Sequence, residues 1–310
     1  MKRIIAVVTD NCNFTCKTCL REYERGHDLD PSIFIKILPE LKKLKYDHVS
    51  ITGGEPIFYQ YFDEFLKIIT TAGLTFNIVS NGYFWKRYVP YVEKYRNYLT
   101  HMDFSLDGAT AEIHDSIRQK GSYVKVIEAF ENFNKLGIRT SAITCLNKIN
   151  KNEIEKIIDL AEKIKCNVFL FGGVVGTDFN KNIVLNIKER ADSLKIINSL
   201  RKKVNLRINA GASLILSDAI NLCCELDSVS GAAINPQGEL IFCCNSIKNG
   251  ASMGSLKNST FLELYLKALD LANEIKKVRA EALCSGNTPD EFHGCHYCNK
   301  FLSDHSNGFH

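Results

Sequence analysis

Three closely spaced cysteines follow an apolar stretch near the start of the chain. The stretch is Ile4–Val8, and the cysteines are Cys12, Cys16 and Cys19. Cysteine thiolates are the usual protein ligands of iron–sulfur clusters. A [4Fe–4S] cluster needs four ligands, so this loop supplies three and leaves the fourth iron open to another molecule. The alternative is a structural zinc site, but such sites pair Cys-x-x-Cys units or add histidines, and no second unit lies near Cys12.

Apolar runs alternate with amphipathic stretches over the first 170 residues. The runs predict six strands, at Ile4–Val8, His48–Thr52, Thr75–Ser80, His101–Ser105, Arg139–Cys145 and Asn167–Phe171. The stretches predict helices at Asp30–Leu44, Tyr61–Thr71, Trp85–Tyr95, Tyr123–Leu136 and Glu153–Lys163, the first of them kinked or split at Pro39. Six strand–helix units indicate a parallel sheet with helices outside it. Because six are too few for an eight-fold barrel, we predict an α/β fold, a partial (β/α)6 barrel.

The chain is long enough for a second domain. Its 310 residues exceed the roughly 250–300 at which one hydrophobic core usually stops growing. After a helix at Lys188–Lys202 and a strand-like piece at Val204–Asn209, a cysteine-rich tail begins. A hairpin is expected there around Pro236-Gln237-Gly238, followed by a long helix at Thr260–Leu283. We therefore predict a barrel domain over residues 1–210 and a small α+β cysteine-rich domain over residues 211–310.

Composition and charge indicate which partners and which cellular compartment to expect. Apolar residues make up 45% and charged residues 24%, and the net charge is +4 with no long basic block, so we expect no nucleic-acid partner. No signal-peptide core is seen, and no stretch reaches the roughly 18–20 apolar residues that span a bilayer, so we expect a cytoplasmic protein without a membrane partner. In a reducing compartment the 12 cysteines are more readily metal ligands or catalytic thiols than disulfides.

Small and polar residues end three consecutive predicted strands. They form the motifs Thr52-Gly53-Gly54-Glu55-Pro56, Ser80-Asn81-Gly82 and Ser105-Leu106-Asp107-Gly108. Adjacent glycines let a backbone approach a ligand closely, and Glu55 offers a carboxylate to an amine. Any one of these motifs is also typical of a plain loop. Their order downstream of the cysteine loop favours a shared binding site at the carboxyl ends of the strands.

Together these motifs resemble those of the radical S-adenosylmethionine superfamily over about residues 3–170. The resemblance implies that Cys12, Cys16 and Cys19 hold a [4Fe–4S] cluster that binds S-adenosylmethionine (SAM). It further implies that SAM is contacted by Gly53, Gly54, Glu55, Pro56, Ser80, Asn81, Ser105 and Asp107. The implied reaction is one-electron cleavage of SAM to a 5′-deoxyadenosyl radical, which abstracts a hydrogen from the substrate. The chain departs from the family at Thr18, where an aromatic residue near the adenine is usual.

The tail contains a second set of cysteines. Cys224, Cys243, Cys295 and Cys298 supply four thiolates, which suit a [4Fe–4S] cluster or a tetrahedral zinc equally well. The tail resembles the short "twitch" form of the family's auxiliary-cluster domain, related to the longer SPASM form, and this implies one auxiliary [4Fe–4S] cluster. The residues leave open which member of the doublets Cys223-Cys224 and Cys243-Cys244 is a ligand, and whether Cys284 replaces one of the four.

Two further thiols are candidate catalytic residues. Cys145 lies near the end of the fifth predicted strand, and Cys223 lies beside a predicted cluster ligand. A thiol near the active site can return a hydrogen atom to a substrate radical, as in family members that epimerise peptide residues. The alternative is that both are small buried hydrophobic residues, which is the usual place of a free cysteine.

The resemblance favours an oxidoreductase that modifies a ribosomally made peptide by crosslinking or epimerisation. The alternatives are a dehydrogenase acting on a small molecule, such as an amino sugar or alcohol, and a non-catalytic iron–sulfur or zinc protein. An electron donor of the flavodoxin or ferredoxin type is an expected partner. Because the first predicted strand begins close to the first residue, we expect a peptide substrate to use a separate recognition protein or to dock directly in the barrel mouth.

Overall fold

The computed structural model describes residues 2–20, 25–211, 213–214, 232–243, 252–284, 298 and 301. The chain forms two compact units. The first unit comprises Met1–Cys12, Tyr23–Phe76 and Ser217–His310, and the second comprises Asn13–Glu22 and Asn77–Leu216. The cysteine loop is therefore shared, because Cys12 ends a segment of the first unit while Cys16 and Cys19 belong to the second.

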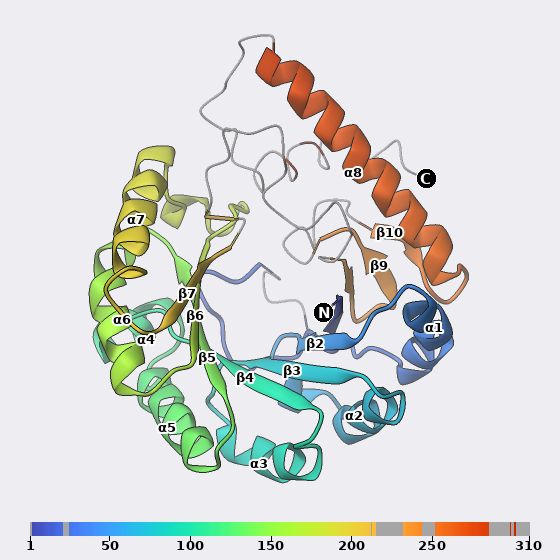
Figure 1. Cartoon of the computed structure of the whole chain (residues 1–310), viewed down its shortest axis with the longest axis horizontal. Helices are drawn as coiled ribbons and strands as arrows, with labels where there is room; N and C mark the ends of the chain where they lie inside the picture. Colours follow the sequence, from blue (N-terminus) through green and yellow to red (C-terminus); the bar gives the residue numbers. More distant parts are fainter. Residues whose placement is uncertain are drawn as a thin grey trace. The chain divides into compact units, whose positions relative to one another are not determined.

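The first unit is built on strand β1 and two neighbours that are parallel to it. Ile4 of β1 aligns with Val49 of β2, and Ile5 of β1 aligns with Ala233 of β8 on the other side. The order of strands in this unit is β10-β9-β8-β1-β2, and helix α8 packs on β9, β10 and α1 (Figure 1). The elements are β1 (Arg3–Val7), α1 (Pro31–Lys43), β2 (His48–Thr52), η1 (Pro56–Phe58), α2 (Phe62–Thr71), β8 (Ala233–Ile234), β9 (Glu239–Ile241), β10 (Ser252–Ser255) and α8 (Phe261–Cys284), together with the start of β3 (Thr75–Ser80).

Helix α1 begins as its sequence predicts but is not split at Pro39. The Asp30 side chain accepts a hydrogen bond from the Ser32 N–H, and Pro31 occupies the first turn. The helix then runs unbroken to Lys43, so the expectation of a split is wrong. Pro39 and Ile35 both lie on the exposed side of the helix, so the Ile35 carbonyl that loses its N–H partner is open to water.

The predicted hairpin around Gly238 is present, and it joins the sheet of the first unit. Strands β8 and β9 pair antiparallel, and Gly238 has a φ of +80°, a conformation that glycine adopts without strain. Because β8 pairs in parallel with β1, the hairpin belongs to the same compact unit as the first strand. This contact-based division does not follow residue 210, and the predicted domains 1–210 and 211–310 stay a prediction.

The second unit continues β3 with four further parallel strands. Their order is β3-β4-β5-β6-β7, with helices along the outer side of the strands (Figure 1). Phe104 of β4 packs edge-on against Phe130 and Phe133 of α5, which fixes this helix on the sheet. The elements are α3 (Trp85–Lys94), β4 (Leu99–Ser105), α4 (Ala111–Ile117), α5 (Ser122–Lys135), β5 (Thr140–Leu146), η2 (Lys151–Glu153), α6 (Ile154–Lys163), β6 (Val168–Gly173), η3 (Lys181–Ile183), α7 (Ile187–Leu200) and β7 (Arg207–Ala210).

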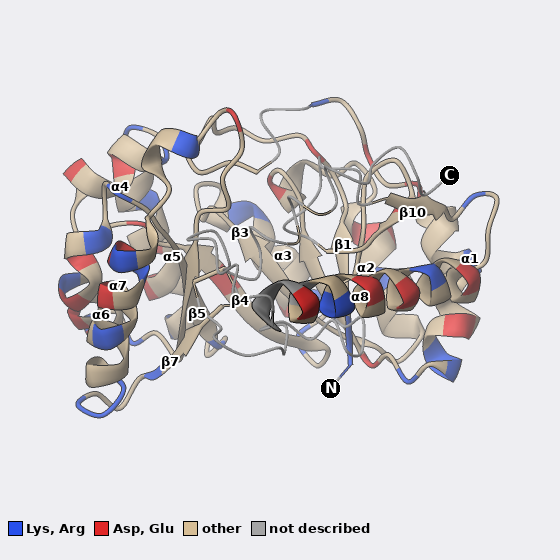
Figure 2. Cartoon of the chain, turned by 90° about the horizontal axis from the view of Figure 1, so that it is seen from above, with Lys and Arg blue, Asp and Glu red and all other residues tan. Residues whose placement is uncertain are grey.

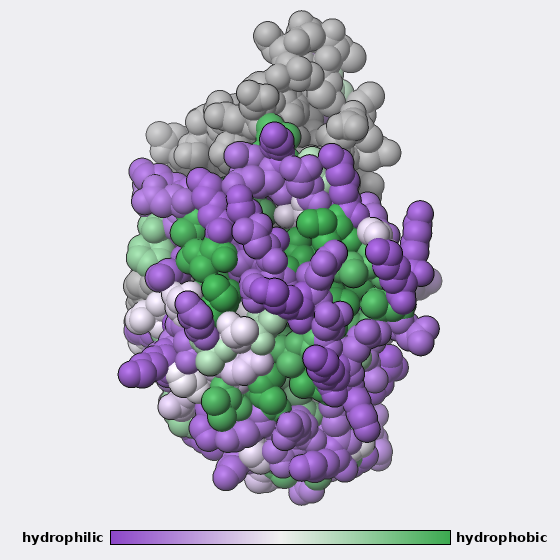
Figure 3. All heavy atoms as spheres, turned by 90° about the vertical axis from the view of Figure 1, so that its left-hand side faces the viewer, coloured by the Kyte–Doolittle hydropathy of each residue, from purple (hydrophilic) through white to green (hydrophobic). Residues whose placement is uncertain are grey.

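The exposed surfaces of the helices are mostly polar, with single apolar exceptions such as Leu262 and Leu266 on α8. Basic and acidic residues alternate along α8 (Figure 2). Hydrophilic side chains also dominate the outer face of the second unit over α6 and α7, with apolar side chains between them (Figure 3). No helix in the described part of the chain is both long and apolar enough to cross a membrane.

Candidate functional site

The start of the cysteine loop packs directly on the glycine pair that follows β2. The Gly54 N–H donates to the Thr9 carbonyl (2.7 Å), and the Glu55 N–H donates to the Asn11 carbonyl (2.8 Å). A Cβ atom on Gly53 would lie 2.6 Å from the Thr9 carbonyl oxygen, and one on Gly54 would overlap the Asn11 carbonyl oxygen. Only glycine fits at these two positions, so the Gly-Gly motif shapes the backbone that leads into Cys12. Glu55 is fully buried beside it, and Pro56 opens the short helix η1.

A second segment of the first unit, which contains His27 and Leu29, forms hydrogen bonds to the same backbone. Both carboxylate oxygens of Asp10 are engaged by His27, one with its backbone N–H (2.8 Å) and one with its ring Nδ1 (2.6 Å). The Asp10 N–H donates to the His27 carbonyl, and the Leu29 N–H donates to the Val8 carbonyl. The residues just before Cys12 are therefore fixed by hydrogen bonds on both sides.

In the second unit, Cys16 and Cys19 lie on one turn that the ends of β3 and α4 hold. The Cys19 N–H donates to the Cys16 carbonyl (3.1 Å), and the Lys17 N–H donates to the Ile117 carbonyl (2.9 Å). Asn81 donates from its side chain to the Asn13 Oδ1 (2.9 Å). The cysteine loop is therefore attached both to the carboxyl end of β3 and to the end of α4.

The polar residues predicted at the end of β3 also shape that end. The Ser80 hydroxyl accepts from the Gly82 N–H (3.0 Å), and the Asn81 Oδ1 accepts from the Tyr83 N–H (2.9 Å). Tyr83 in turn contacts the ring of Phe14 edge-on, with centroids 5.5 Å apart. Asn81 therefore both forms its own turn and holds the cysteine loop.

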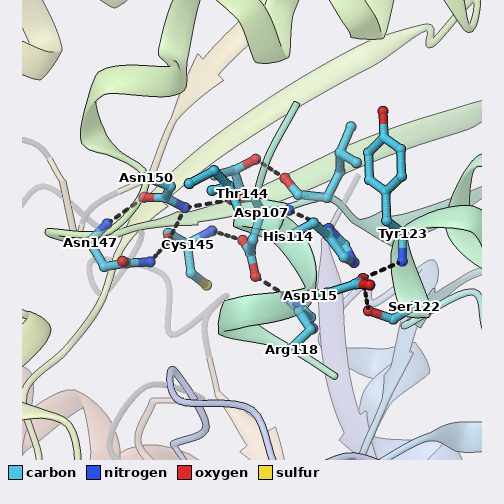
Figure 4. Close-up of polar contacts among 12 residues, drawn as sticks. Asp107, His114, Asp115, Arg118, Ser122, Tyr123, Thr144, Cys145, Asn147 and Asn150 are labelled. Atoms are coloured by element: carbon cyan, nitrogen blue, oxygen red, sulfur yellow. Dashed lines mark hydrogen bonds and ion pairs between the residues drawn. The ribbon is translucent and has the colours of Figure 1, made fainter. Parts of the chain in front are cut away.

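Asp107 is the centre of a buried polar network at the end of β4 (Figure 4). Its carboxylate accepts from the Arg118 Nε–H (2.6 Å) and from the Cys145 N–H (2.8 Å), and its backbone N–H donates to the His114 Nδ1 (3.1 Å). The Asn150 side chain donates to the Asp107 carbonyl (3.0 Å). Asp107 therefore links β4, α4 and β5, and the protein already engages both of its carboxylate oxygens.

Gly108 lets helix α4 approach this network. A Cβ atom there would lie 2.6 Å from the His114 N atom and 2.9 Å from the Ile113 side chain. The sequence reasoning did not predict α4, nor His114 or Arg118 as partners of Asp107. The sequence did contain an indication of these partners. His114 and Arg118 are four residues apart, one helical turn, in the segment that follows Asp107, so a helix there places them on the same face.

Burial determines the charge states in the network. Burial raises the pKa of the Cys145 thiol to about 12, with the Asp107 carboxylate adding to the effect, so this thiol is protonated at neutral pH. Burial opposes the charge of Arg118, but the negative charge of the Asp107 carboxylate outweighs this effect and raises the pKa of Arg118. Burial also lowers the pKa of His114 to about 4, so its ring is neutral. The buried Nε2 of His114 has no hydrogen-bond partner among the described residues.

The neutral His114 predicts a pH dependence of stability. Its pKa is about 4 in the folded state and about 6.5 when exposed, so the unfolded chain binds the extra proton between these values. The contribution is fully present above pH 6.5 and is lost as the pH falls towards 4, by up to about 1.4 kcal/mol of unfolding free energy per pH unit. Urea unfolding at pH 7 and pH 5 measures it. His114→Gln is expected to flatten that slope, and an unchanged slope would contradict a neutral buried imidazole.

Asp103, on β4 of the second unit, is a further buried polar residue, and the sequence did not predict it. Asp103 of β4 accepts from the Asn77 side chain (2.5 Å) and pairs with the His101 Nε2 (3.1 Å). It also accepts from the Ser141 hydroxyl of the neighbouring strand β5. The signal was the polar alternation His101, Asp103, Ser105 along one strand, which is unusual in a parallel sheet buried on both faces. Ser105 is buried at the end of β4.

The second cysteine set lies mostly outside the described residues. Cys223, Cys224 and Cys295 are not described, Cys243 follows β9 with partial exposure, and Cys298 is buried. Cys284 is the last residue of α8. Within the described part of the chain no three histidine, cysteine or acidic side chains gather as a metal site. The auxiliary cluster and its ligands therefore stay a prediction.

A parallel sheet with functional loops at the carboxyl ends of its strands is typical of many α/β proteins. Comparison with known proteins shows to which family of these the chain belongs. The family model described as the radical SAM superfamily matches residues 6–161. The chain therefore belongs to the radical SAM superfamily.

Two relatives illustrate the range of this likeness. The mycofactocin maturase MftC of Mycolicibacterium smegmatis is 28% identical over 161 residues, which cover 50% of this chain and 40% of that protein. The GTP 3′,8-cyclase of Nautilia profundicola is 26% identical over 166 residues, which cover 50% of this chain and 51% of that protein. The match spans about half or less of the length of these curated relatives.

Solved structures extend the likeness to most of the chain. SuiB of Streptococcus suis bound to S-adenosylmethionine has a TM-score of 0.72 at 16% identity, covering 87% of this chain and 68% of that chain. Native anSMEcpe with bound AdoMet and the Kp18Cys peptide has a TM-score of 0.69 at 16% identity, covering 99% of this chain and 96% of that chain. These likenesses confirm the predicted fold class, a mixed α/β fold with the parallel sheet of the radical SAM partial barrel.

The residues present fit the cofactors that the family implies. The three thiols of the cysteine loop are the donor type of an iron–sulfur cluster, and the Gly53-Gly54 backbone lies so close to that loop that any side chain would disturb it. A [4Fe–4S] cluster and SAM are accordingly the cofactors of the family to which this chain belongs.

Proposed function

We propose that this chain is a radical SAM oxidoreductase that modifies a ribosomally made peptide by crosslinking or epimerisation. The observation that carries the proposal is the fit of the Gly53-Gly54 pair against Thr9–Asn11, immediately before Cys12, in a chain of this family. Support for a peptide substrate comes from the fold, because SuiB was solved with its precursor peptide SuiA and anSMEcpe was solved with a peptide.

In this proposal each site residue has a role toward a bound cofactor. Cys12, Cys16 and Cys19 would hold the [4Fe–4S] cluster, and Gly53, Gly54, Glu55 and Pro56 would hold the methionyl part of SAM. Ser80, Asn81, Ser105 and Asp107 would complete its pocket, with Asp107 acting through Arg118 and the Cys145 backbone that it binds. When bound, the reduced cluster and SAM would supply the radical chemistry needed to abstract a hydrogen atom from the substrate. The chain itself orients the substrate and excludes water.

The tail extends the proposal to a second cluster. Cys224, Cys243, Cys295 and Cys298 would hold an auxiliary [4Fe–4S] cluster, with the alternatives Cys223, Cys244 and Cys284 noted above. A flavodoxin or ferredoxin would supply electrons, and a separate recognition protein would present the peptide in the cytoplasm. Iron counting after anaerobic reconstitution tests this extension, because two clusters bind about twice the iron of one.

Mass spectrometry of a candidate peptide tests the substrate class. A short precursor peptide encoded beside this gene is incubated anaerobically with the protein, SAM and dithionite in deuterated water. A crosslink appears as the loss of two hydrogen atoms, and epimerisation appears as one deuterium at an α-carbon. Relatives that act as GTP 3′,8-cyclases favour the small-molecule alternative. An unmodified peptide alongside a modified nucleotide, amino sugar or alcohol would establish that alternative instead.

Cys145 is the proposed hydrogen donor in the described part of the chain. A thiol must be protonated to return a hydrogen atom, and burial raises the pKa of Cys145 to about 12. Cys145→Ala is expected to leave SAM cleavage intact while the epimerised product disappears and products of an unquenched radical accumulate. The control is Cys166→Ala, because that thiol is buried next to β6 and hydrogen-bonds the Val168 carbonyl. Unchanged product in both Cys145→Ala and Cys223→Ala would remove the hypothesis.

A further inference from the structure

Arg118 is held in one position by the buried carboxylate of Asp107. The Arg118 Nε lies 2.6 Å from the Asp107 Oδ2, and the side chains are 12% and 0% exposed (Figure 4). The other carboxylate oxygen accepts from the Cys145 N–H, so the acid cannot turn away from strand β5. Asp107 is thus anchored on both oxygens, and the guanidinium it binds is placed with it.

The backbone that carries Arg118 lies beside the cysteine loop. Lys17 follows Cys16 directly, and its N–H donates to the carbonyl of Ile117, the residue that precedes Arg118 (2.9 Å). This backbone hydrogen bond brings the two segments together within the second unit. Arg118 and Cys16 are each the direct chain neighbour of one of the two residues that this hydrogen bond joins.

We propose that Arg118, positioned by Asp107, raises the reduction potential of the cluster that Cys16 binds. The inference rests on the proposed function, since it needs the cluster. On reduction the cluster takes one electron from the reductant and becomes more negative by one charge, and no bond forms or breaks. A fixed positive charge nearby favours the reduced state, and more strongly when both lie away from water. Arg118 accordingly makes the cluster easier to reduce through its charge, and Asp107 is the residue that positions it.

The test is a potentiometric titration of the reconstituted protein, without SAM, followed by EPR of the reduced cluster. Arg118→Met removes the positive charge and is expected to shift the midpoint potential to more negative values. The expected size is about a tenfold change in the equilibrium constant for one-electron reduction, or about 59 mV. Asp107→Asn keeps an oxygen for the Cys145 N–H but removes the compensating negative charge, so it is expected to shift the potential in the opposite direction.

Shifts of the midpoint potential in opposite directions indicate an electrostatic role, because damage to the fold would shift the potential of both variants in the same direction. Arg118→Lys keeps the charge and is expected to restore a potential close to that of the unaltered protein. Lys125→Met removes an equal charge from the exposed Lys125–Glu128 pair on α5 and is expected to leave the potential unchanged, because water screens it.

Outcomes of two kinds would overturn the inference. If the unaltered protein binds a cluster and Arg118→Met leaves its potential unchanged, or if both variants shift it in the same direction, Arg118 does not tune the cluster. If the unaltered protein binds no iron–sulfur cluster at all, the proposed function fails and the inference fails with it. Iron content and the EPR signal, measured in every variant before the titration, distinguish these two cases.

Discussion

Gly54→Ala is expected to lose most of the cluster iron that the unaltered protein binds. The added Cβ would overlap the Asn11 carbonyl oxygen and lie 2.6 Å from the Asp10 carbonyl oxygen. Both neighbours are backbone atoms that hydrogen bonds to the Glu55 N–H and to the 25–29 segment hold in place, so the loop before Cys12 must move. Overpacking of this kind costs about 1–3 kcal/mol of unfolding free energy. Iron per chain after anaerobic reconstitution and urea unfolding measure the two effects.

The matched control for this substitution is Gly211→Ala. A Cβ at Gly211 would meet only ordinary contacts, the nearest being the Phe171 carbonyl oxygen at 3.6 Å. It is expected to keep both the iron content and the unfolding free energy of the unaltered protein. Full iron content in Gly54→Ala would show that the glycine pair does not shape the cysteine loop.

Asp107→Leu is expected to be the most destabilising single change in the second unit. It leaves the guanidinium of Arg118 without its acid in a site that is 12% exposed, and it removes the acceptor of the Cys145 N–H. Removal of one partner of a buried pair costs about 3–5 kcal/mol of unfolding free energy. Urea unfolding at neutral pH measures the loss.

A double variant and a surface variant complete this experiment. Asp107→Leu with Arg118→Met removes the unpaired charge and is expected to recover part of the lost free energy, because the two side chains contact each other. Asp192→Ala breaks the exposed pair with Lys195 and is expected to cost at most about 1 kcal/mol. Equal losses in Asp107→Leu and Asp192→Ala would show that the buried pair contributes nothing beyond a surface one.

Much of the fold could be predicted from sequence because its strands are apolar runs bounded by turn residues. The strands His48–Thr52 and Thr75–Ser80 occur as predicted, and the other four are shifted by at most two residues at either end. Helix α4 was missed because its seven residues are too few to show a period. The parallel pairing of β8 with β1 is a contact between residues more than 200 positions apart, which a local pattern does not encode.

Part of the candidate site could likewise be predicted from the sequence, and part could not. The glycine pair was singled out because its residue type allows a close backbone approach, and the structure places it against the backbone of Thr9–Asn11, while its contact with SAM stays a prediction. Asp107 was predicted as a residue that contacts SAM, while the structure shows it bound to Arg118 and to the Cys145 N–H. The partners of this carboxylate depend on how the end of α4 and strand β5 come together at the end of β4, and that arrangement comes from packing rather than from spacing along the chain.

Anaerobic incubation of the reconstituted protein with SAM and dithionite tests the account most directly. The account predicts a [4Fe–4S] EPR signal that SAM perturbs, together with formation of 5′-deoxyadenosine. It also predicts that replacement of Cys12, Cys16 or Cys19 by alanine abolishes both. A protein that carries one zinc ion in this loop, shows no cluster signal and releases no 5′-deoxyadenosine would contradict the account.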